Sequence, residues 1–306
     1  MAPLPDDRRP ALSSQHREHN RHSGSHSTDL FMAPPGAPEP PAVLLFHHIP
    51  KTAGTSLRNF IQANLAGHEH VWDVPRVSRD RAALLEWYRV ALHGLSDDRR
   101  ARLACVMSHS ANFMLPALEG PVHAVTMLRD PVDRVGSQWA VRSDRARRKA
   151  ERKRSEAART LREGSLAELY ERLGGGTPRD SELPPRFASF FNGQSRSLLR
   201  PHYDLDDLPY SAGPPPDADR WRERLFEDVA PRYEIGLRED FEAFVQRLAA
   251  RYGWRVLLPR AKVNAHRGAR PEPDAGTVTA IEAHNWLDLE LYARCTASSP
   301  AASAAP

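Results

Sequence analysis

Residues 43–61 read VLLFHHIPKTAGTSLRNFI and contain the pattern that decides the fold. The apolar run over 43–46 predicts a buried β-strand. After a short loop, apolar residues recur at helical spacing at Leu57, Phe60 and Ile61, which predicts an amphipathic α-helix. The stretch is therefore a predicted strand–loop–helix unit, the building block of an α/β protein.

Beyond this unit, short apolar runs alternate with amphipathic stretches along the chain. This alternation favours an α/β domain with a parallel sheet flanked by helices over a helical bundle or a β-sandwich. The further predicted elements are strands at 105–107, 122–128 and 234–237, helices starting at 131, over 241–252 and around 281–294, and a surface loop over 203–219.

The chain of 306 residues is long enough for one large domain or two small ones. Residues 1–40 lack a periodic apolar pattern, and residues 297–306 are only Ala, Ser and Pro. Segments of this kind cannot bury enough apolar surface to fold, so both are predicted to be disordered tails. We therefore expect a single domain over 41–296 between two disordered tails.

Composition limits the cellular setting. The formal net charge is only +4, from 43 Lys and Arg against 39 Asp and Glu, which is not the bias of a nucleic-acid coat protein. The two cysteines cannot form a disulfide framework, and no Asn-x-Ser/Thr sequon occurs. No apolar run is long enough for a signal peptide or a membrane span. We expect a cytoplasmic protein without a transmembrane segment.

Three predicted strands end at residues with obvious chemistry. The first leads into the loop 50–56, the second ends at His109, and the third ends at Arg129. In an open parallel sheet, ligands bind outside the carboxyl ends of the strands, near the switch in strand order. These residues are therefore predicted to meet at one site.

The loop 50–56 combines a lysine, a glycine and several hydroxyls with the start of a helix. Backbone N–H groups and the positive end of a helix bind phosphate-like anions. The loop is not a Walker A motif, because Lys51 precedes Gly54. The alternative is a plain strand-to-helix turn, in which Gly54 permits tight packing and Thr55 and Ser56 cap the helix.

Two of these motifs resemble a known family. Residues 48–57 (HIPKTAGTSL) are similar to the 5′-phosphosulfate-binding loop of sulfotransferases that use 3′-phosphoadenosine-5′-phosphosulfate (PAPS), in the branch of carbohydrate and heparan sulfate 2-O-type enzymes. Residues 128–139 (LRDPVDRVGSQW) resemble the 3′-phosphate-binding segment of that family. Fainter similarities lie at 192–196 (NGQSR), 235–237 (IGL), 262–264 (KVN) and 288–292.

The resemblance implies a P-loop-like parallel sheet and in-line transfer of a sulfuryl group from PAPS to a hydroxyl, with no metal. Lys51 would stabilise charge on the departing nucleotide, and Arg129 and Ser137 would hold the 3′-phosphate. The loop residues implied in binding the 5′-phosphate are Lys51, Thr52, Ala53, Gly54, Thr55 and Ser56. The family more commonly has Gly where this chain has Ala53.

The arginines also have a structural interpretation, in which Arg129 or Arg134 forms an ion pair with Asp130 or Asp133. This interpretation is favoured for Arg134, whereas phosphate binding is favoured for Arg129.

His109 is the candidate general base, because it ends a strand beside the predicted transfer site and imidazole suits deprotonation of a hydroxyl. The sequence around it, Met-Ser-His-Ser over 107–110, departs from the family's more usual Gly-His. His47 and His48, at the end of the first strand, are competing candidates. We expect His48 to pack or to orient the loop.

The acceptor is predicted to be a carbohydrate or another small molecule with a hydroxyl. Residues 142–163 contain ten Lys or Arg against four acids, which suits either an anionic acceptor such as a uronic-acid saccharide or a solvated helix. No specific nucleic-acid partner is expected, because interleaved aromatic residues are absent. The alternative functions are a nucleotide-dependent kinase and a nucleotide-binding protein without turnover.

Overall fold

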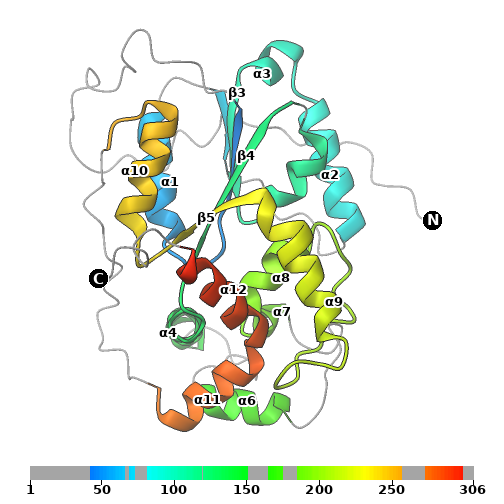
Figure 1. Ribbon diagram of the computed structural model, residues 1–306, viewed down its shortest axis with the longest axis vertical. Helices are drawn as coiled ribbons and strands as arrows, with labels where there is room; N and C mark the ends of the chain where they lie inside the picture. Colours follow the sequence, from blue (N-terminus) through cyan, green and yellow to red (C-terminus); the bar gives the residue numbers. More distant parts are fainter. Residues whose placement is uncertain are drawn as a thin grey trace.

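The computed structural model describes residues 42–65, 69–72, 81–118, 120–150, 165–174, 185–256 and 273–298. Within these ranges, five strands form one sheet in the order β2-β3-β1-β4-β5, and every neighbouring pair is parallel (Figure 1). The strands are β1 (Val43–His47), β2 (Glu69–Trp72), β3 (Leu103–Ser108), β4 (Val122–Leu128) and β5 (Tyr233–Leu237). The predicted α/β class with a parallel sheet is confirmed.

Helices follow or connect the strands in the order expected for this class. They are α1 (Gly54–Asn64), α2 (Arg81–His93), α3 (Asp97–Ala101), the 3-10 helix η3 (Ala111–Ala117), α4 (Pro131–Ala150), α6 (Leu166–Gly174), α7 (Pro185–Ala188), α8 (Gly193–Leu199), α9 (Ala218–Glu223), the π-helical turn η4 (Arg224–Val229), the 3-10 turn η5 (Ala230–Arg232), α10 (Phe241–Tyr252), α11 (Ala275–His284) and α12 (Trp286–Ala297).

The sheet separates two apolar layers (Figure 1). Leu44 and Phe46 of β1 belong to the layer covered by α1 and α10, whereas Leu45 belongs to the layer covered by α2, η3, α8, η4 and α12. This division follows from the alternation of side chains along a strand. A third apolar cluster joins α4, α6 and α11 beyond the carboxyl ends of the strands.

Several predicted elements differ in extent from those observed. β1, β3 and β5 are one to three residues longer than predicted, and the edge strand β2 was not predicted, because four residues carry too little pattern. The prediction of a loop through 219 was wrong at its end, because α9 begins at Ala218.

The predicted single helix around 281–294 is wrong, because α11 and α12 meet at Asn285. The Asn285 side chain is fully buried and donates to the carbonyls of Ile281 and Phe190, at 2.8 and 2.9 Å. Its Oδ1 accepts from the backbone N–H of Asn192 at 2.9 Å. Side-chain bonds of this kind compete with the helix backbone and end α11.

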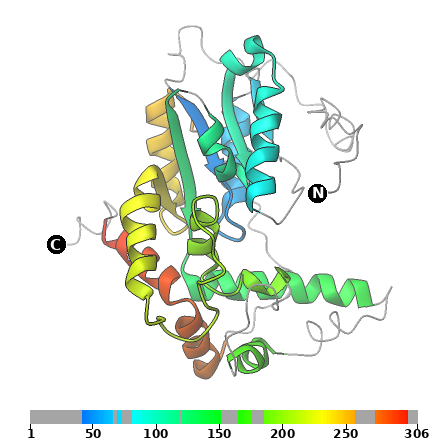
Figure 2. The same ribbon diagram turned by 90° about the vertical axis from the view of Figure 1, so that its right-hand side faces the viewer.

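The segments predicted as tails fall mostly outside the described residues. This holds for 1–40 and for 299–306, whereas Ala297 is the last residue of α12. Of the basic segment, the part up to Ala150 continues α4, and Figure 2 shows this helix extending away from the sheet. Within the described ranges, no helix has the length and apolar character needed to cross a bilayer.

We expect Asn285→Ala to lower the free energy of unfolding by about 2 to 4 kcal/mol, because it leaves several buried backbone groups without partners. The control is Asn59→Ala, at an exposed position of α1, which should change stability by less than about 0.5 kcal/mol. Urea unfolding of both variants measures the difference. Equal stability of the two would show that α11 and α12 do not need this junction.

Candidate functional site

The loop between β1 and α1 has an unusual backbone. Lys51 and Ala53 adopt left-handed conformations, with φ of 74° and 71°. Such a conformation costs a residue with a Cβ atom roughly 1 kcal/mol. Ala53 stands at the position where the resembling loops more commonly have glycine, which would adopt the same φ without this cost. The loop is therefore held in a strained conformation by its surroundings.

Two residues of the predicted anion-binding loop make contacts that stabilise the loop itself. The Thr52 side chain is fully buried, and its hydroxyl donates to the carbonyl of Ile49 at 2.9 Å. A Cβ atom at Gly54 would lie 1.9 Å from Cδ2 of His48, so the imidazole packs directly on this glycine. Any contact of Thr52 and Gly54 with an anion is therefore through backbone N–H groups.

Four backbone N–H groups of the loop are available to a ligand. Those of Thr52, Ala53, Gly54 and Thr55 have no hydrogen-bond acceptor within the described part of the chain. The next N–H in sequence, of Ser56, already donates to the carbonyl of Ala53 at 2.9 Å. Together with the positive end of α1, these donors form a cradle for an anion.

Arg129 joins the end of β4 to this loop. Its guanidinium donates to the carbonyl of Lys51 at 3.4 Å and to Oδ2 of Asp133 at 2.8 Å, and the residue is only 6% exposed. The same Asp133 oxygen accepts from Arg238 at 3.0 Å. The two predicted nucleotide-binding motifs are therefore adjacent, and the predicted ion pair of Arg129 with Asp133 is also present.

Gln194, which the sequence analysis did not select as a site residue, forms hydrogen bonds with both backbone groups of Arg129. Its side chain accepts from the N–H of Arg129 at 3.0 Å and donates to the carbonyl of Arg129 at 2.9 Å. Asp288 accepts from the N–H groups of Gln194 and Ser195, at 3.0 and 2.7 Å, and so fixes the start of α8. The similarity at 192–196 was the sequence signal for this clamp.

Arg134 forms a structural ion pair, as predicted, but its partner is Asp288. It is 1% exposed and lies 3.8 Å from Asp288, rather than beside Asp130 or Asp133. Burial lowers the pKa of Arg134, and the nearby Asp288 acts in the opposite direction. A Cβ atom at Gly193 would lie 2.9 Å from Nη2 of Arg134, which explains the glycine before Gln194.

Ser137 lies on the Asp133 face of α4, one turn further along the helix. The residue is 5% exposed. Its spacing places it on the side of α4 that carries Asp133, the partner of Arg129.

His109 is exposed and has a defined tautomer. Its Nδ1 lies 2.6 Å from the carbonyl oxygen of His48, and its ring stacks on that of His48 at 4.3 Å. A carbonyl only accepts, so Nδ1 carries the proton in the neutral ring and Nε2 keeps its lone pair. This is the arrangement that a general base requires.

The competing histidines are less suited to that role. Burial, helped by the neighbouring His109, lowers the pKa of His47 and His48 to about 3. His47 is fully buried, and its Nε2 lies 3.0 Å from the hydroxyl of Ser197. His47 therefore joins the carboxyl end of the central strand β1 to α8, and His48 packs against both the loop and His109.

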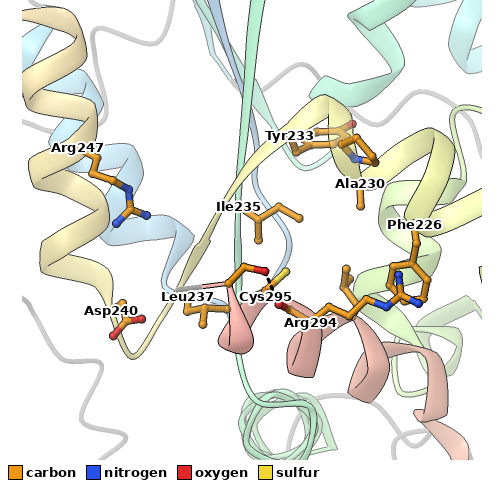
Figure 3. A pocket seen from close by; sticks show the side chains of 12 residues that line it. Phe226, Ala230, Tyr233, Ile235, Leu237, Asp240, Arg247, Arg294 and Cys295 are labelled. Carbon is orange, nitrogen blue, oxygen red and sulfur yellow. Dashed lines mark hydrogen bonds between the residues drawn. The ribbon is translucent and has the colours of Figure 1, made fainter. Parts of the chain in front are cut away.

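Two hollows lined by described residues lie outside this loop. One, of about 290 Å³, runs along β5, with Arg247 and Asp240 on one side and Arg294 and Cys295 on the other (Figure 3). The other, of about 620 Å³, lies between α2 and η3. None of the predicted site residues lines either hollow. Among the described side chains, no group of three or more His, Cys, Asp or Glu is arranged to hold a metal ion.

Comparison with known proteins adds no family assignment. No family model matches this sequence, and no curated protein is significantly similar to it.

We expect Ala53→Gly to raise the free energy of unfolding by about 0.5 to 1 kcal/mol, because glycine adopts the observed φ without a Cβ clash. Gly54→Ala should lower it by about 1 to 3 kcal/mol, because the new methyl group displaces the His48 ring. Urea unfolding of the two neighbouring variants tests this. A stabilising Gly54→Ala would contradict the observed packing.

We expect stability to fall as the pH drops below 6.5, the ordinary pKa of histidine. The unfolded chain then binds a proton that folded His47 excludes down to its pKa of about 3. For this group alone, the free energy of unfolding decreases by about 1.4 kcal/mol per pH unit in that range. Urea unfolding between about pH 7 and 5 should show a smaller slope in His47→Asn than in the wild type. An unchanged slope would assign the proton uptake to other groups.

Proposed function

We propose that this protein is a sulfotransferase that moves a sulfuryl group from PAPS to a hydroxyl acceptor, on a P-loop-like sheet. One observation carries the proposal: the Arg129 guanidinium is bonded to the Lys51 carbonyl, so the two motifs that resemble the donor-binding segments lie side by side. They also flank the switch point of the sheet, because β1 is followed in the chain by β2 and β3 on one side and by β4 on the other.

The loop and Arg129 supply two separate anion contacts. The N–H groups of Thr52 to Thr55 are suited to the 5′-phosphate, since they have no other acceptor in the described residues. Arg129 and Ser137 are suited to the 3′-phosphate, with Asp133 holding the guanidinium until an anion takes its place. A nucleotide with phosphates at both positions uses both contacts.

His109 and Lys51 provide the chemistry of transfer. The acceptor oxygen forms a bond to sulfur while the bond between sulfur and the bridging oxygen of the donor breaks. Nε2 of His109 takes the acceptor proton, because Nδ1 is occupied by the His48 carbonyl. The Lys51 ammonium stabilises the negative charge that develops on the bridging oxygen. The products are a sulfate ester and 3′-phosphoadenosine-5′-phosphate (PAP).

Calorimetric titration with PAP, AMP and ATP with Mg²⁺ tests the donor site. Wild type should bind PAP more tightly than AMP, and Arg129→Ala should lose this preference, whereas Lys51→Ala weakens both. His109→Ala should bind PAP with nearly unchanged affinity and lose turnover. Arg220→Ala, at a half-exposed arginine on α9, is the control and should behave as wild type.

Other outcomes point to the alternatives. A preference for ATP with Mg²⁺ would favour the kinase, and PAP binding without transfer to any hydroxyl would favour the binding protein without turnover. Equal loss of PAP binding in all three site variants would mean that His109 is structural.

A further inference from the structure

Two neighbouring strands end in the same pair of residue types. β4 ends at Leu128 and β5 at Leu237, and each leucine is followed by an arginine, Arg129 and Arg238. The two leucines are paired in the sheet, and the N–H of Arg238 donates to the carbonyl of Leu128 at 2.8 Å (Figure 1). Because neighbouring strands lie about 4.8 Å apart, the two arginines stand side by side at the carboxyl edge of the sheet.

Both guanidinium groups reach the same carboxylate oxygen. Oδ2 of Asp133 accepts from Nη2 of Arg129 at 2.8 Å and from Nη1 of Arg238 at 3.0 Å. Two planar cations that converge on one oxygen form an arrangement that binds anions, since guanidinium groups grip carboxylates and phosphates in this way. In this structure, the anion between the two arginines is a side chain of the protein itself.

The position between the two arginines is accessible from solvent. The side chains of Asp133 and Arg238 are 52% and 42% exposed, whereas Arg129 is buried and bonded to the carbonyl of Lys51. Arg129 is therefore a fixed wall of the position, and the other two side chains can move without disturbing the core. An incoming anion can replace the Asp133 carboxylate there.

The acids that follow the two arginines are directed elsewhere. Asp130 accepts from the backbone N–H of Asp133 at 2.8 Å and so caps the start of α4. Burial, together with the neighbouring Glu239, raises the pKa of Tyr292, which places Glu239 beside α12. Asp133 is thus the carboxylate that shares its oxygen between the two arginines.

The alternative interpretation is an ordinary surface ion pair between Arg238 and Asp133, which would contribute little to stability. Two features distinguish this pair. Arg129, which shares the Asp133 oxygen, is bonded to the loop that presents N–H groups for an anion. Ser137 lies on the same face of α4, one turn beyond Asp133. The position is therefore part of the candidate site.

The charges indicate which anion would replace Asp133. The carboxylate neutralises one of the two guanidinium charges. A terminal phosphate carries close to two negative charges near pH 7 and has three acceptor oxygens, so it can neutralise both arginines and bond to both at once. A phosphodiester or a second carboxylate, each with one charge, would gain little over Asp133.

We propose that Arg129 and Arg238 together form a site for a terminal phosphate with two negative charges, which Asp133 occupies in the absence of ligand. The identity of the ligand rests on the proposed sulfotransferase function: the phosphate is then the 3′-phosphate of PAPS. Arg238 is thereby a specificity-determining residue that separates PAP from AMP.

The test measures, by calorimetry, the binding of PAP, of adenosine 3′-monophosphate (3′-AMP) and of AMP, whose phosphate is at the 5′ position. The variant is Arg238→Ala. The matched control is Arg247→Ala on α10 (Figure 3), because Arg247 is also 42% exposed and also lies beside a carboxylate, 3.7 Å from Glu234. Urea unfolding checks that both variants are as stable as the wild type.

We expect Arg238→Ala to weaken binding of PAP and 3′-AMP by about tenfold and of AMP by less than about twofold. Arg247→Ala should change none of the three affinities by more than about twofold. The methyl ester of 3′-AMP, which has one negative charge less, should bind to the wild type more weakly than 3′-AMP, and Arg238→Ala should reduce this difference.

The ligands separate failure of this inference from failure of the proposed function. If the wild type prefers PAP to AMP and Arg238→Ala keeps that preference, the inference is wrong and the sulfotransferase proposal stands. If 3′-AMP binding depends on Arg238 but PAP binds no more tightly than 3′-AMP, the two-arginine site stands and the proposed function fails. Equal losses in Arg238→Ala and Arg247→Ala, or no binding of PAP and 3′-AMP to the wild type, would overturn the inference.

Discussion

The pair of hydrogen bonds between the Gln194 side chain and the backbone of Arg129 is the constraint on which the candidate site depends. It holds the end of β4, and with it the guanidinium that reaches the Lys51 loop. Gln194 is itself fixed by Asp288, a fully buried residue of α12. Because buried polar groups are costly unless paired, this network admits few alternative arrangements. The last described helix, α12, thus positions residues at the candidate site.

A second set of contacts shapes the loop. His48 packs on Gly54, stacks on His109 and accepts its hydrogen bond through the backbone carbonyl. One residue therefore determines both the path of the loop and the tautomer of the candidate base. The left-handed conformations of Lys51 and Ala53 are tolerated because the buried Thr52 hydroxyl and the Arg129 guanidinium hold the loop from either side.

Groups that can bind an anion gather at the carboxyl ends of β1 and β4. The loop after β1 contributes N–H groups that have no acceptor among the described residues, and the end of β4 contributes the Arg129 guanidinium. The hollow between α2 and η3 is separate from these groups, because none of the predicted site residues lines it. His109 follows β3 directly, and its ring stacks on that of His48.

The sequence alone determined the parallel α/β class, four of the strands and the helix after the loop, because these depend on short-range periodicity. It also selected Lys51, in the loop after the first predicted strand, and His109 and Arg129, at the ends of two others. Contacts between distant residues were decided only by tertiary structure, such as the Gln194 clamp, which joins positions 65 apart. The same holds for the break at Asn285, where side-chain hydrogen bonds to distant backbone groups overrode a local helical pattern. Local patterns record which face of an element is buried, but not which polar groups will meet there.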